Sequence, residues 1–140
     1  MKKVLASVMA AAAFLAGAGT AVGAGDWRAI ETLRSPGVKF QQGDYRFNPP
    51  GRNHGAFEWR GRLRDADKED GHNVYMEVRV QGHDWVAYYG KQGKTVFMHH
   101  LNWDGAQRYT NHAFVRSCRD KGTLRPDNCS MARHYQIARD

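Results

Sequence analysis

Two stretches decide the fold class of this chain: Phe57-Glu58-Trp59-Arg60-Gly61-Arg62-Leu63-Arg64 and Val74-Tyr75-Met76-Glu77-Val78-Arg79-Val80. In each of them every second residue is apolar or glycine, and the residues between carry charged or polar groups. Successive side chains of a β-strand point to opposite faces, so this alternation predicts two strands that each bury one face. The segment between them, Asp65–His72, contains turn-forming residues and no apolar periodicity, which predicts a loop.

We expect these two strands to pair as an antiparallel hairpin. One register brings the apolar faces together and also opposes charged residues of opposite sign. Its pairs are Leu63–Val74, Trp59–Val78, Phe57–Val80, Arg60–Glu77 and Glu58–Arg79. A slip by one residue would turn every apolar side chain to the wrong face, so the pattern specifies this register strongly.

Short alternating segments separated by Gly-rich turns continue after Val80. A turn at Gly82-His83 leads into a third strand, for which the expected pairs are Trp85–Val80, Ala87–Val78 and Tyr89–Met76. Further strands are expected over 95–101 and 108–119, whereas 131–137 fits either a strand or a short helix. This series predicts an all-β domain over residues 56–140, either an antiparallel β-sandwich or a partly open barrel.

Residues 1–24 have the pattern of a secretory signal peptide. Two lysines are followed by an apolar run and by small residues that end at Ala24, and the run is too short to span a bilayer. Removing 24 residues from 140 leaves 116, enough for one domain, and loss of the two lysines lowers the formal net charge from +7 to +5. We therefore expect a small, mildly basic, secreted protein with no membrane span.

Residues 25–55 are expected to form a loosely structured N-terminal arm, because this segment contains three of the four prolines. Asp26 could cap a short helix with Trp27 and Leu33 on one face, although the same residues fit a strand. The arm also carries several large apolar side chains, which disordered segments usually lack. We therefore expect at least part of Val38–Phe47 to lie on the domain as an extended strand.

The two cysteines, Cys118 and Cys129, are expected to form a disulfide, since a lone pair of cysteines in an exported protein is usually oxidised. Closing so short a loop stabilises a fold by about 3 kcal/mol in the chain-entropy account.

Two motifs carry a resemblance to a known group of proteins. The stretch 65–78, Asp-x-x-x-x-Asp-Gly-His-x-Val-Tyr-x-Glu-Val, resembles the central hairpin of small secreted actinobacterial β-sandwich proteins. Val115-Arg116-Ser117-Cys118-Arg119, with Cys129 downstream, resembles their closing strand and disulfide. The resemblance covers about residues 57–130; it implies a secreted β-sandwich and assigns no activity.

Metal chemistry is not expected. Asp65, Asp67, Glu69 and Asp70 crowd one loop, yet counting from Asp65 places a glycine at position seven and a methionine at position twelve, which is not an EF-hand. A calcium site of another type is the weaker interpretation, and a solvated polar turn is the stronger. Among the histidines, His99 and His100 should point to opposite faces, and a cross-strand pair of His99 with His112 is a minor alternative.

Catalytic motifs are also missing from the sequence. It contains neither Gly-x-Ser-x-Gly nor His-Glu-x-x-His. A secreted phosphodiesterase or ribonuclease is the alternative function, because such enzymes need a base, an acid and an arginine clamp around a phosphate. The candidates are Glu58, Arg60, Glu77 and Arg79, together with a histidine.

Aromatic residues on polar faces are the remaining indication of function. Tyr75 and Tyr88 are expected to flank Arg62 and Arg79 on one surface, and Trp103 lies at a turn. Exposed rings of this kind stack on sugars or anchor protein partners. The sequence thus favours a secreted, non-catalytic binding module with no cofactor and with a protein or glycan partner at the cell envelope. Nucleic acid is not an expected partner, and the sequence assigns no oligomeric state.

Overall fold

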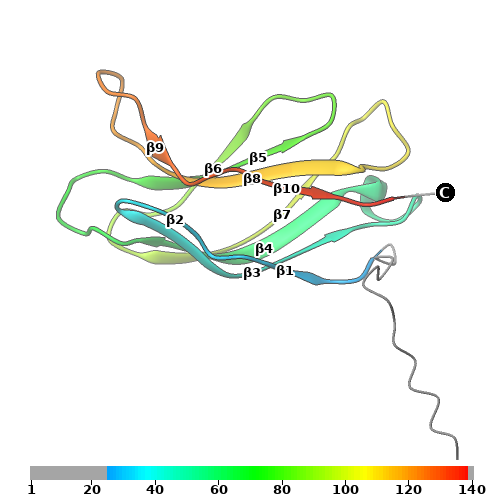
Figure 1. Ribbon diagram of the computed structural model, residues 1–140, viewed down its shortest axis with the longest axis horizontal. Helices are drawn as coiled ribbons and strands as arrows, with labels where there is room; N and C mark the ends of the chain where they lie inside the picture. Colours follow the sequence, from blue (N-terminus) through cyan, green and yellow to red (C-terminus); the bar gives the residue numbers. More distant parts are fainter. Residues whose placement is uncertain (1–24, 139–140) are drawn as a thin grey trace, which may run out of the picture.

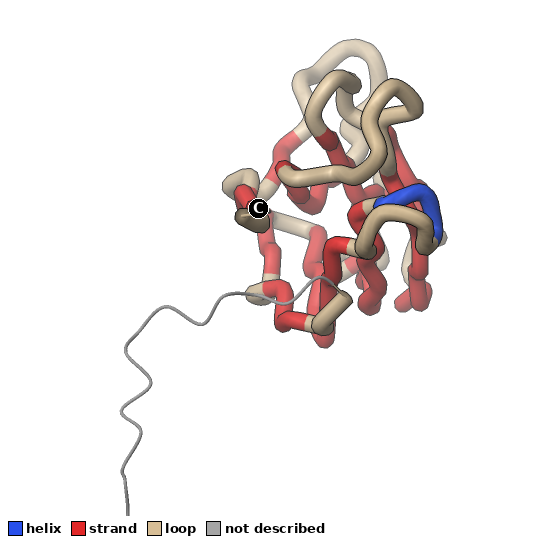
Figure 2. The backbone as a smooth tube through the Cα atoms, turned by 90° about the vertical axis from the view of Figure 1, so that its right-hand side faces the viewer, coloured by secondary structure: helices blue, strands red, loops and turns tan. Residues whose placement is uncertain are grey.

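The computed structural model describes residues 25–138, which form two antiparallel five-stranded sheets packed face to face (Figure 1). An end-on view shows the strands in two layers, with the longer loops gathered at one side (Figure 2). The all-β sandwich is therefore confirmed. The proposed signal peptide, 1–24, lies outside the described residues. Among the described residues no helix is long and apolar enough to cross a membrane.

Sheet A has the strand order β1-β3-β4-β7, with β2 also paired to β3. Its strands are β1 (Arg28–Ile30), β2 (Leu33–Ser35), β3 (Val38–Phe47), β4 (Phe57–Asp65) and β7 (Thr95–Asn102). Sheet B has the order β10-β8-β5-β6, with β9 also paired to β8. Its strands are β5 (Val74–Val80), β6 (Val86–Tyr89), β8 (His112–Arg119), β9 (Asn128–Cys129) and β10 (Arg133–Gln136). A short 3-10 turn, η1 (Asn53–Gly55), follows β3.

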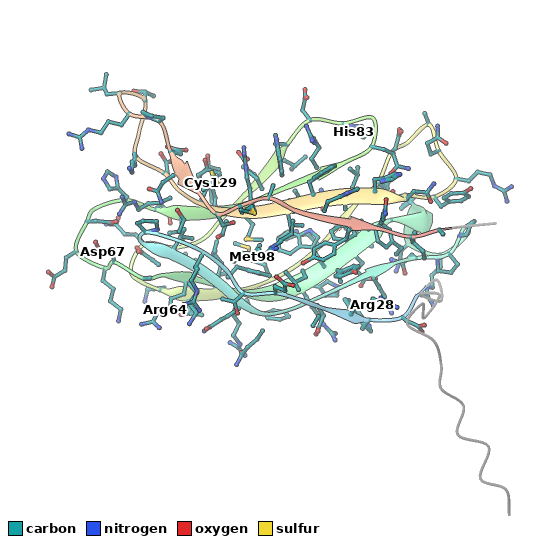
Figure 3. The ribbon with its side chains drawn as sticks, viewed as in Figure 1. Arg28, Arg64, Asp67, His83, Met98 and Cys129 are labelled. Carbon is teal, nitrogen blue, oxygen red and sulfur yellow. A yellow bond between two sulfur atoms is a disulfide. The ribbon has the colours of Figure 1, made fainter. Side chains whose placement is uncertain are left out.

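The core lies between the sheets, where the inward residues of both layers meet. Met98 lies in this space (Figure 3), and the largest fully buried side chain is that of Trp59. The ring of Phe40 fits only because Gly43 and Gly61 carry no side chain: a Cβ on Gly61 would lie 2.2 Å from the ring. Each such buried apolar side chain contributes about 1.5–3 kcal/mol through removal from water.

The predicted hairpin between β4 and β5 is wrong, although both strands and their inward faces are as expected. β4 pairs with β3 and β7, so Trp59 is aligned with Tyr45 and His100 rather than with Val78. β5 pairs with β6 and β8 in the other sheet. An alternating pattern specifies which face of a strand is buried, but not which strand lies beside it. Two strands can bury their apolar faces against each other across the sandwich as well as by pairing within one sheet. The expected charge pairs are therefore replaced by Arg46–Glu58 and Arg116–Glu77.

The expected β5–β6 register is also wrong, by one residue. Val78 is aligned with Val86, and Met76 with Tyr88. This shift turns Tyr88 toward the core. Trp85, expected in the core, is half-buried against arginines on the outer face of sheet B.

The segment 25–55 is better ordered than the loosely structured arm that was expected. β3 is an interior strand of sheet A, which confirms that Val38–Phe47 lies on the domain as an extended strand. β1 and β2 pair with opposite halves of β3, so the helical alternative for this region is wrong. The open choice at the C-terminal end is settled in favour of a strand, β10.

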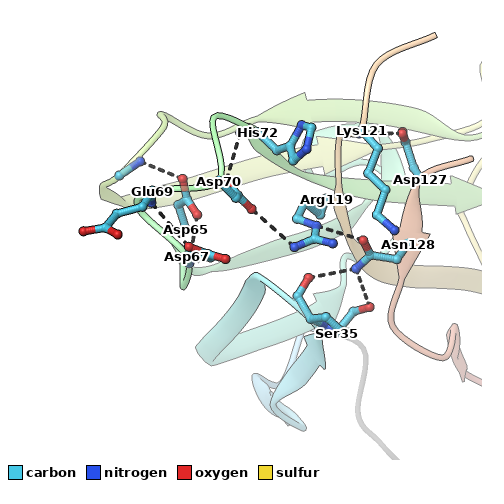
Figure 4. Close-up of polar contacts among 12 residues, drawn as sticks. Ser35, Asp65, Asp67, Glu69, Asp70, His72, Arg119, Lys121, Asp127 and Asn128 are labelled. Atoms are coloured by element: carbon cyan, nitrogen blue, oxygen red, sulfur yellow. Dashed lines mark hydrogen bonds and ion pairs between the residues drawn. The ribbon is translucent and has the colours of Figure 1, made fainter. Parts of the chain in front are cut away.

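The disulfide Cys118–Cys129 is confirmed, and it links β8 to β9 at directly aligned positions. Next to it, Arg119 donates a hydrogen bond from Nε to Asn128 Oδ1, and Asn128 Nδ2 donates to the Ser35 hydroxyl of sheet A (Figure 4). This polar contact ties the disulfide loop to both sheets.

Candidate functional site

The five residues predicted to bind a ligand do not form one surface. Tyr75 and Arg79 project from β5 on the outside of sheet B, whereas Arg62 projects from β4 on the outside of sheet A, where it is exposed. Trp103 directly follows β7, and Tyr88 faces the core. The expected surface assumed that β4 and β5 share a sheet, which they do not.

Two of the five side chains, those of Tyr88 and Tyr75, already form hydrogen bonds within the protein. Tyr88 accepts a hydrogen bond from Asn102 Nδ2 at 2.7 Å and packs edge-on against Trp59, and burial raises its pKa. Tyr75 is only 6% exposed, and its hydroxyl donates to Asp127 of the disulfide loop. Burial and Asp127 together raise the pKa of Tyr75 well above its usual range. Neither tyrosine is free to stack on a ligand.

An exposed apolar row runs along the outside of β7, the edge strand of sheet A. We call the outward residues Phe97, His99, Leu101 and Trp103 the β7 row. Phe97 is 56% exposed, Trp103 41% and Leu101 36%, which is unusual for side chains of this size on one strand. The sequence predicted the strand over 95–101, and its alternation was the signal that could have identified these outward residues.

The β7 row ends in a concave platform. The imidazole of His54 stacks on the Trp103 indole with the ring centroids 4.5 Å apart and the planes 9° from parallel. A concavity of about 540 Å³ opens beside these rings and is lined by Gly51, Asn53, His54, Leu101 and Trp103.

The loop that carries His54 is held in place by its neighbours. His54 itself adopts a left-handed backbone conformation, with φ 59° and ψ 19°. Gly55 follows with φ +61°, and a Cβ there would lie 2.5 Å from the Arg108 carbonyl oxygen. Thr110 N donates to the Gly55 carbonyl at 2.8 Å, and Arg52 Nε donates to Asn48 Oδ1 at 3.1 Å. The platform is thus positioned before any ligand arrives.

A row of arginines on β4 lies beside the β7 row. Arg62 is aligned with Phe97, and its guanidinium lies 6.0 Å from the centroid of that ring. Arg64 points away from the sandwich on the same side (Figure 3). Arg60 forms an ion pair with Asp44, but Arg62 and Arg64 form no ion pair within residues 25–138. Two uncommitted cations therefore border the apolar row.

A carboxylate, an imidazole and an arginine converge farther along the same face. Glu58 is 4% exposed and accepts hydrogen bonds from Arg46 Nε at 2.7 Å and Asn48 Nδ2 at 3.1 Å, while His99 Nε2 lies 2.7 Å from its other oxygen. We call these residues the Glu58 cluster. Burial alone would raise the pKa of Glu58, but the hydrogen bonds outweigh it and lower the pKa to about 2.

Trp27 completes this part of the surface, because its ring lies against the guanidinium groups of Arg46 and Arg60 at 4.4 and 3.9 Å. The sequence placed Trp27 in the arm and gave it no part in a site.

On the outside of sheet B, cations cover the Trp85 and Phe114 rings. Arg79 was expected between Tyr75 and Tyr88, but it contacts Trp85 at 5.0 Å and Phe114 at 4.7 Å. Arg116 lies 4.2 Å from the Trp85 ring and also forms an ion pair with Glu77. Arginine side chains and aromatic rings therefore alternate in contact with one another over the outside of the sheet.

The acidic loop that raised the question of calcium uses three of its four carboxylates, those of Asp65, Asp67 and Asp70, as acceptors within the protein (Figure 4). Asp65 is fully buried and accepts hydrogen bonds from the main-chain nitrogens of Asp67 and Gly93. Asp70 accepts one from His72 N and forms an ion pair with Arg119 at 3.3 Å. Across residues 25–138, no three His, Cys, Asp or Glu side chains are grouped so that they could hold a metal ion.

The predicted His99–His112 pair is wrong, because the two residues belong to different sheets. His112 instead lies beside His134 of β10, with 3.1 Å between Nδ1 of the first ring and Nε2 of the second. His99 and His100 do point to opposite faces, as expected: His99 meets Glu58 outside, and His100 packs on Tyr88 inside.

Comparisons with known proteins give no match to this chain among protein families, curated proteins or solved structures.

Proposed function

We propose that this protein is a secreted, non-catalytic binding module that holds an acidic glycan of the cell envelope on the β7 row. The observation that carries the proposal is the row itself, in which three large apolar side chains remain exposed on one edge strand and lead into a concavity. Exposed large apolar side chains that follow one another along one edge of a sheet are typical of interaction sites.

The composition of the surface favours a sugar polymer over a flat protein partner. Stacked Trp103 and His54 rings present a flat apolar platform, and Asn53 supplies a polar rim. A volume of about 540 Å³ lies in the range of small-ligand sites. Arg62 and Arg64 lie beside the row and have no carboxylate partners among residues 25–138, which suits a ligand that carries acid groups.

Secretion is part of the proposal. It is supported by the leader pattern of residues 1–24, by the resemblance to small secreted actinobacterial β-sandwich proteins, and by the disulfide, which is compatible with an oxidising compartment.

Affinity electrophoresis through gels that contain either a soluble polyuronate or an uncharged glucan tests the proposal. We expect the polyuronate to retard the protein, and Trp103→Ala to weaken binding at least about tenfold, since stacked aromatic residues dominate such sites. Arg62→Gln should reduce retardation by the polyuronate and leave any weak retention by the glucan unchanged.

Tyr89→Ala is the matched control, because Tyr89 is an aromatic residue, 59% exposed, on the edge strand of the other sheet. If Trp103→Ala binds the polyuronate as tightly as the unmodified protein, or if Tyr89→Ala loses as much affinity as Trp103→Ala, the proposed site is wrong. If the protein binds one specific protein and no glycan, the ligand of the site is a protein partner rather than a glycan.

A second candidate function is hydrolysis of phosphodiesters, and the Glu58 cluster is the observation that favours it. Glu58, His99 and Arg46 are in contact, as a base, an acid and a clamp would be. Both Glu58 oxygens are already hydrogen-bonded, however, and with a pKa of about 2 this carboxylate is a weak base at neutral pH. Cleavage of single-stranded RNA that is lost in both Glu58→Gln and His99→Ala would establish the enzyme and contradict the non-catalytic proposal.

A further inference from the structure

A second concavity lies on the opposite face of the molecule from the β7 row. It opens on the outside of sheet B at the end of β5, has a volume of about 380 Å³, and is lined by Arg79, Val80, Gln81, Gly82, His83, His112 and Phe114. Three of these side chains carry, or can carry, positive charge. The turn that contributes His83 lies at the end of the sandwich (Figure 3).

Arg79 is held rigidly at this concavity. Its guanidinium contacts the Trp85 ring, from the segment that leads into β6, and the Phe114 ring, from β8 on the other side of β5. Contacts with ring faces hold the guanidinium plane and leave its N–H edges for other acceptors. Within the described part of the chain Arg79 forms no ion pair with a carboxylate.

The histidines add further donors beside Arg79. His134 stacks on Phe114 with the planes 8° apart, and its Nε2 lies 3.1 Å from Nδ1 of His112. When His134 donates this hydrogen bond, Nε2 of His112 carries a proton that it can donate to a ligand. The main chain at His112 is fixed, because the Gln81 side-chain oxygen accepts from its backbone nitrogen at 2.7 Å.

One carboxylate beside this turn, that of Asp104, is already engaged. Asp104 lies 3.6 Å from His83 Nε2, is 15% exposed, and accepts a hydrogen bond from Ala106 N. Its charge is therefore directed at His83 and at its own turn rather than left unpaired beside Arg79.

We infer that this concavity is a binding site for a tetrahedral oxyanion, a phosphate or sulfate group, held by the Arg79 guanidinium and the His112 imidazole. A planar guanidinium matches two oxygens of such a group, and the neighbouring imidazole donates to a third. The site is separate from the β7 row and does not depend on the proposed function. The anion could be a free inorganic ion or an ester group on a polymer.

Nuclear magnetic resonance titration of the ¹⁵N-labelled protein tests the inference. Inorganic phosphate, inorganic sulfate and glycerol phosphate are added in separate experiments at constant ionic strength set with chloride. We expect saturable shifts of the Arg79 Nε–H, Gly82 and His112 signals, with the β7 row signals unchanged. Tighter binding of glycerol phosphate than of inorganic phosphate would indicate an ester as the ligand, and the reverse order a free ion.

Arg79→Lys keeps the charge and removes the planar fork, and it should weaken binding at least about fivefold. His112→Asn is a second variant, which leaves the contacts of Arg79 with Trp85 and Phe114 in place, in case the first one perturbs the sheet. Arg34→Lys is the matched control, since Arg34 is an exposed arginine of β2 in the other sheet and lines neither concavity. Absence of saturable shifts at these residues, unchanged affinity in both Arg79→Lys and His112→Asn, or an equal loss of affinity in Arg34→Lys would each overturn the inference.

Discussion

Two groups of aromatic residues on the outer faces of this sandwich have opposite surroundings. On sheet B, Trp85 contacts two guanidinium groups and the Tyr75 hydroxyl donates a hydrogen bond to Asp127, so these two aromatic residues are covered. On sheet A, Phe97 and Trp103 stay exposed, and Arg62 beside Phe97 has no carboxylate partner within residues 25–138.

This difference indicates where the fold uses aromatic side chains for stability and where it leaves them available. A ring covered by cations and hydrogen bonds contributes to folding, since both partners are already satisfied. An exposed ring contributes little to folding and retains surface that a ligand can remove from water. The covered face should therefore respond to mutation through stability, and the exposed face through binding.

The largest expected effect concerns the disulfide that supports the covered face. Replacing both Cys118 and Cys129 by Ser opens a loop between residues 11 apart and should lower the free energy of unfolding by about 3 kcal/mol in urea titrations. Asp127 lies in this loop and helps to raise the pKa of Tyr75, so the pKa of Tyr75 should fall toward its ordinary value in a spectrophotometric titration.

A matched control is polyuronate binding, which should persist in the double variant under conditions where it is folded. An unchanged free energy of unfolding would show that the loop is held by its polar contacts rather than by the disulfide.

The next prediction concerns the buried carboxylate of Glu58, on the same side of the sandwich as the β7 row. Glu58 has its pKa lowered from 4.5 to about 2 in the folded protein, so its ionised form stabilises the fold above about pH 4.5. This contribution is lost as the pH falls from about 4.5 to 2, because the unfolded chain takes up the proton first. Glu58→Gln should lower the free energy of unfolding by about 2 to 3 kcal/mol at pH 7 and flatten its dependence on pH in that window.

Asp44→Asn is the control for the Glu58 prediction, because Asp44 forms a more exposed ion pair on the same face, at 3.5 Å from Arg60. Exposed pairs contribute about 0 to 1 kcal/mol. A Glu58→Gln protein that keeps the acid-induced loss of stability between pH 4.5 and 2 would show that another carboxylate is responsible.

The sequence was sufficient to predict the inward faces of β4 and β5, but neither the inward face of β6 nor the partners of each strand. Alternation of Phe57, Trp59 and Leu63 identified buried side chains correctly, whereas the pairing of β4 depends on β3, whose proline-flanked segment looked like an arm. The binding surface could not be predicted for the same reason. Arg62 and Arg79 appeared to share a face only while β4 and β5 were taken as neighbours in one sheet.

The smallest effect separates the two faces directly, by removing one ring from each. Trp85→Ala should lower the free energy of unfolding by about 1 to 2 kcal/mol, since two cation–π contacts of about 0.5–1 kcal/mol are lost together. Phe97→Ala removes a ring that is 56% exposed and lies 6.0 Å from one guanidinium, so its cost should stay below about 0.5 kcal/mol. Binding should show the opposite order, with the polyuronate held more weakly by Phe97→Ala and equally well by Trp85→Ala. Urea unfolding and affinity electrophoresis on the same two preparations give both readouts. Equal losses of stability in the two variants would mean that the exposed row is part of the folded structure's own packing, and the distinction between the faces would fail.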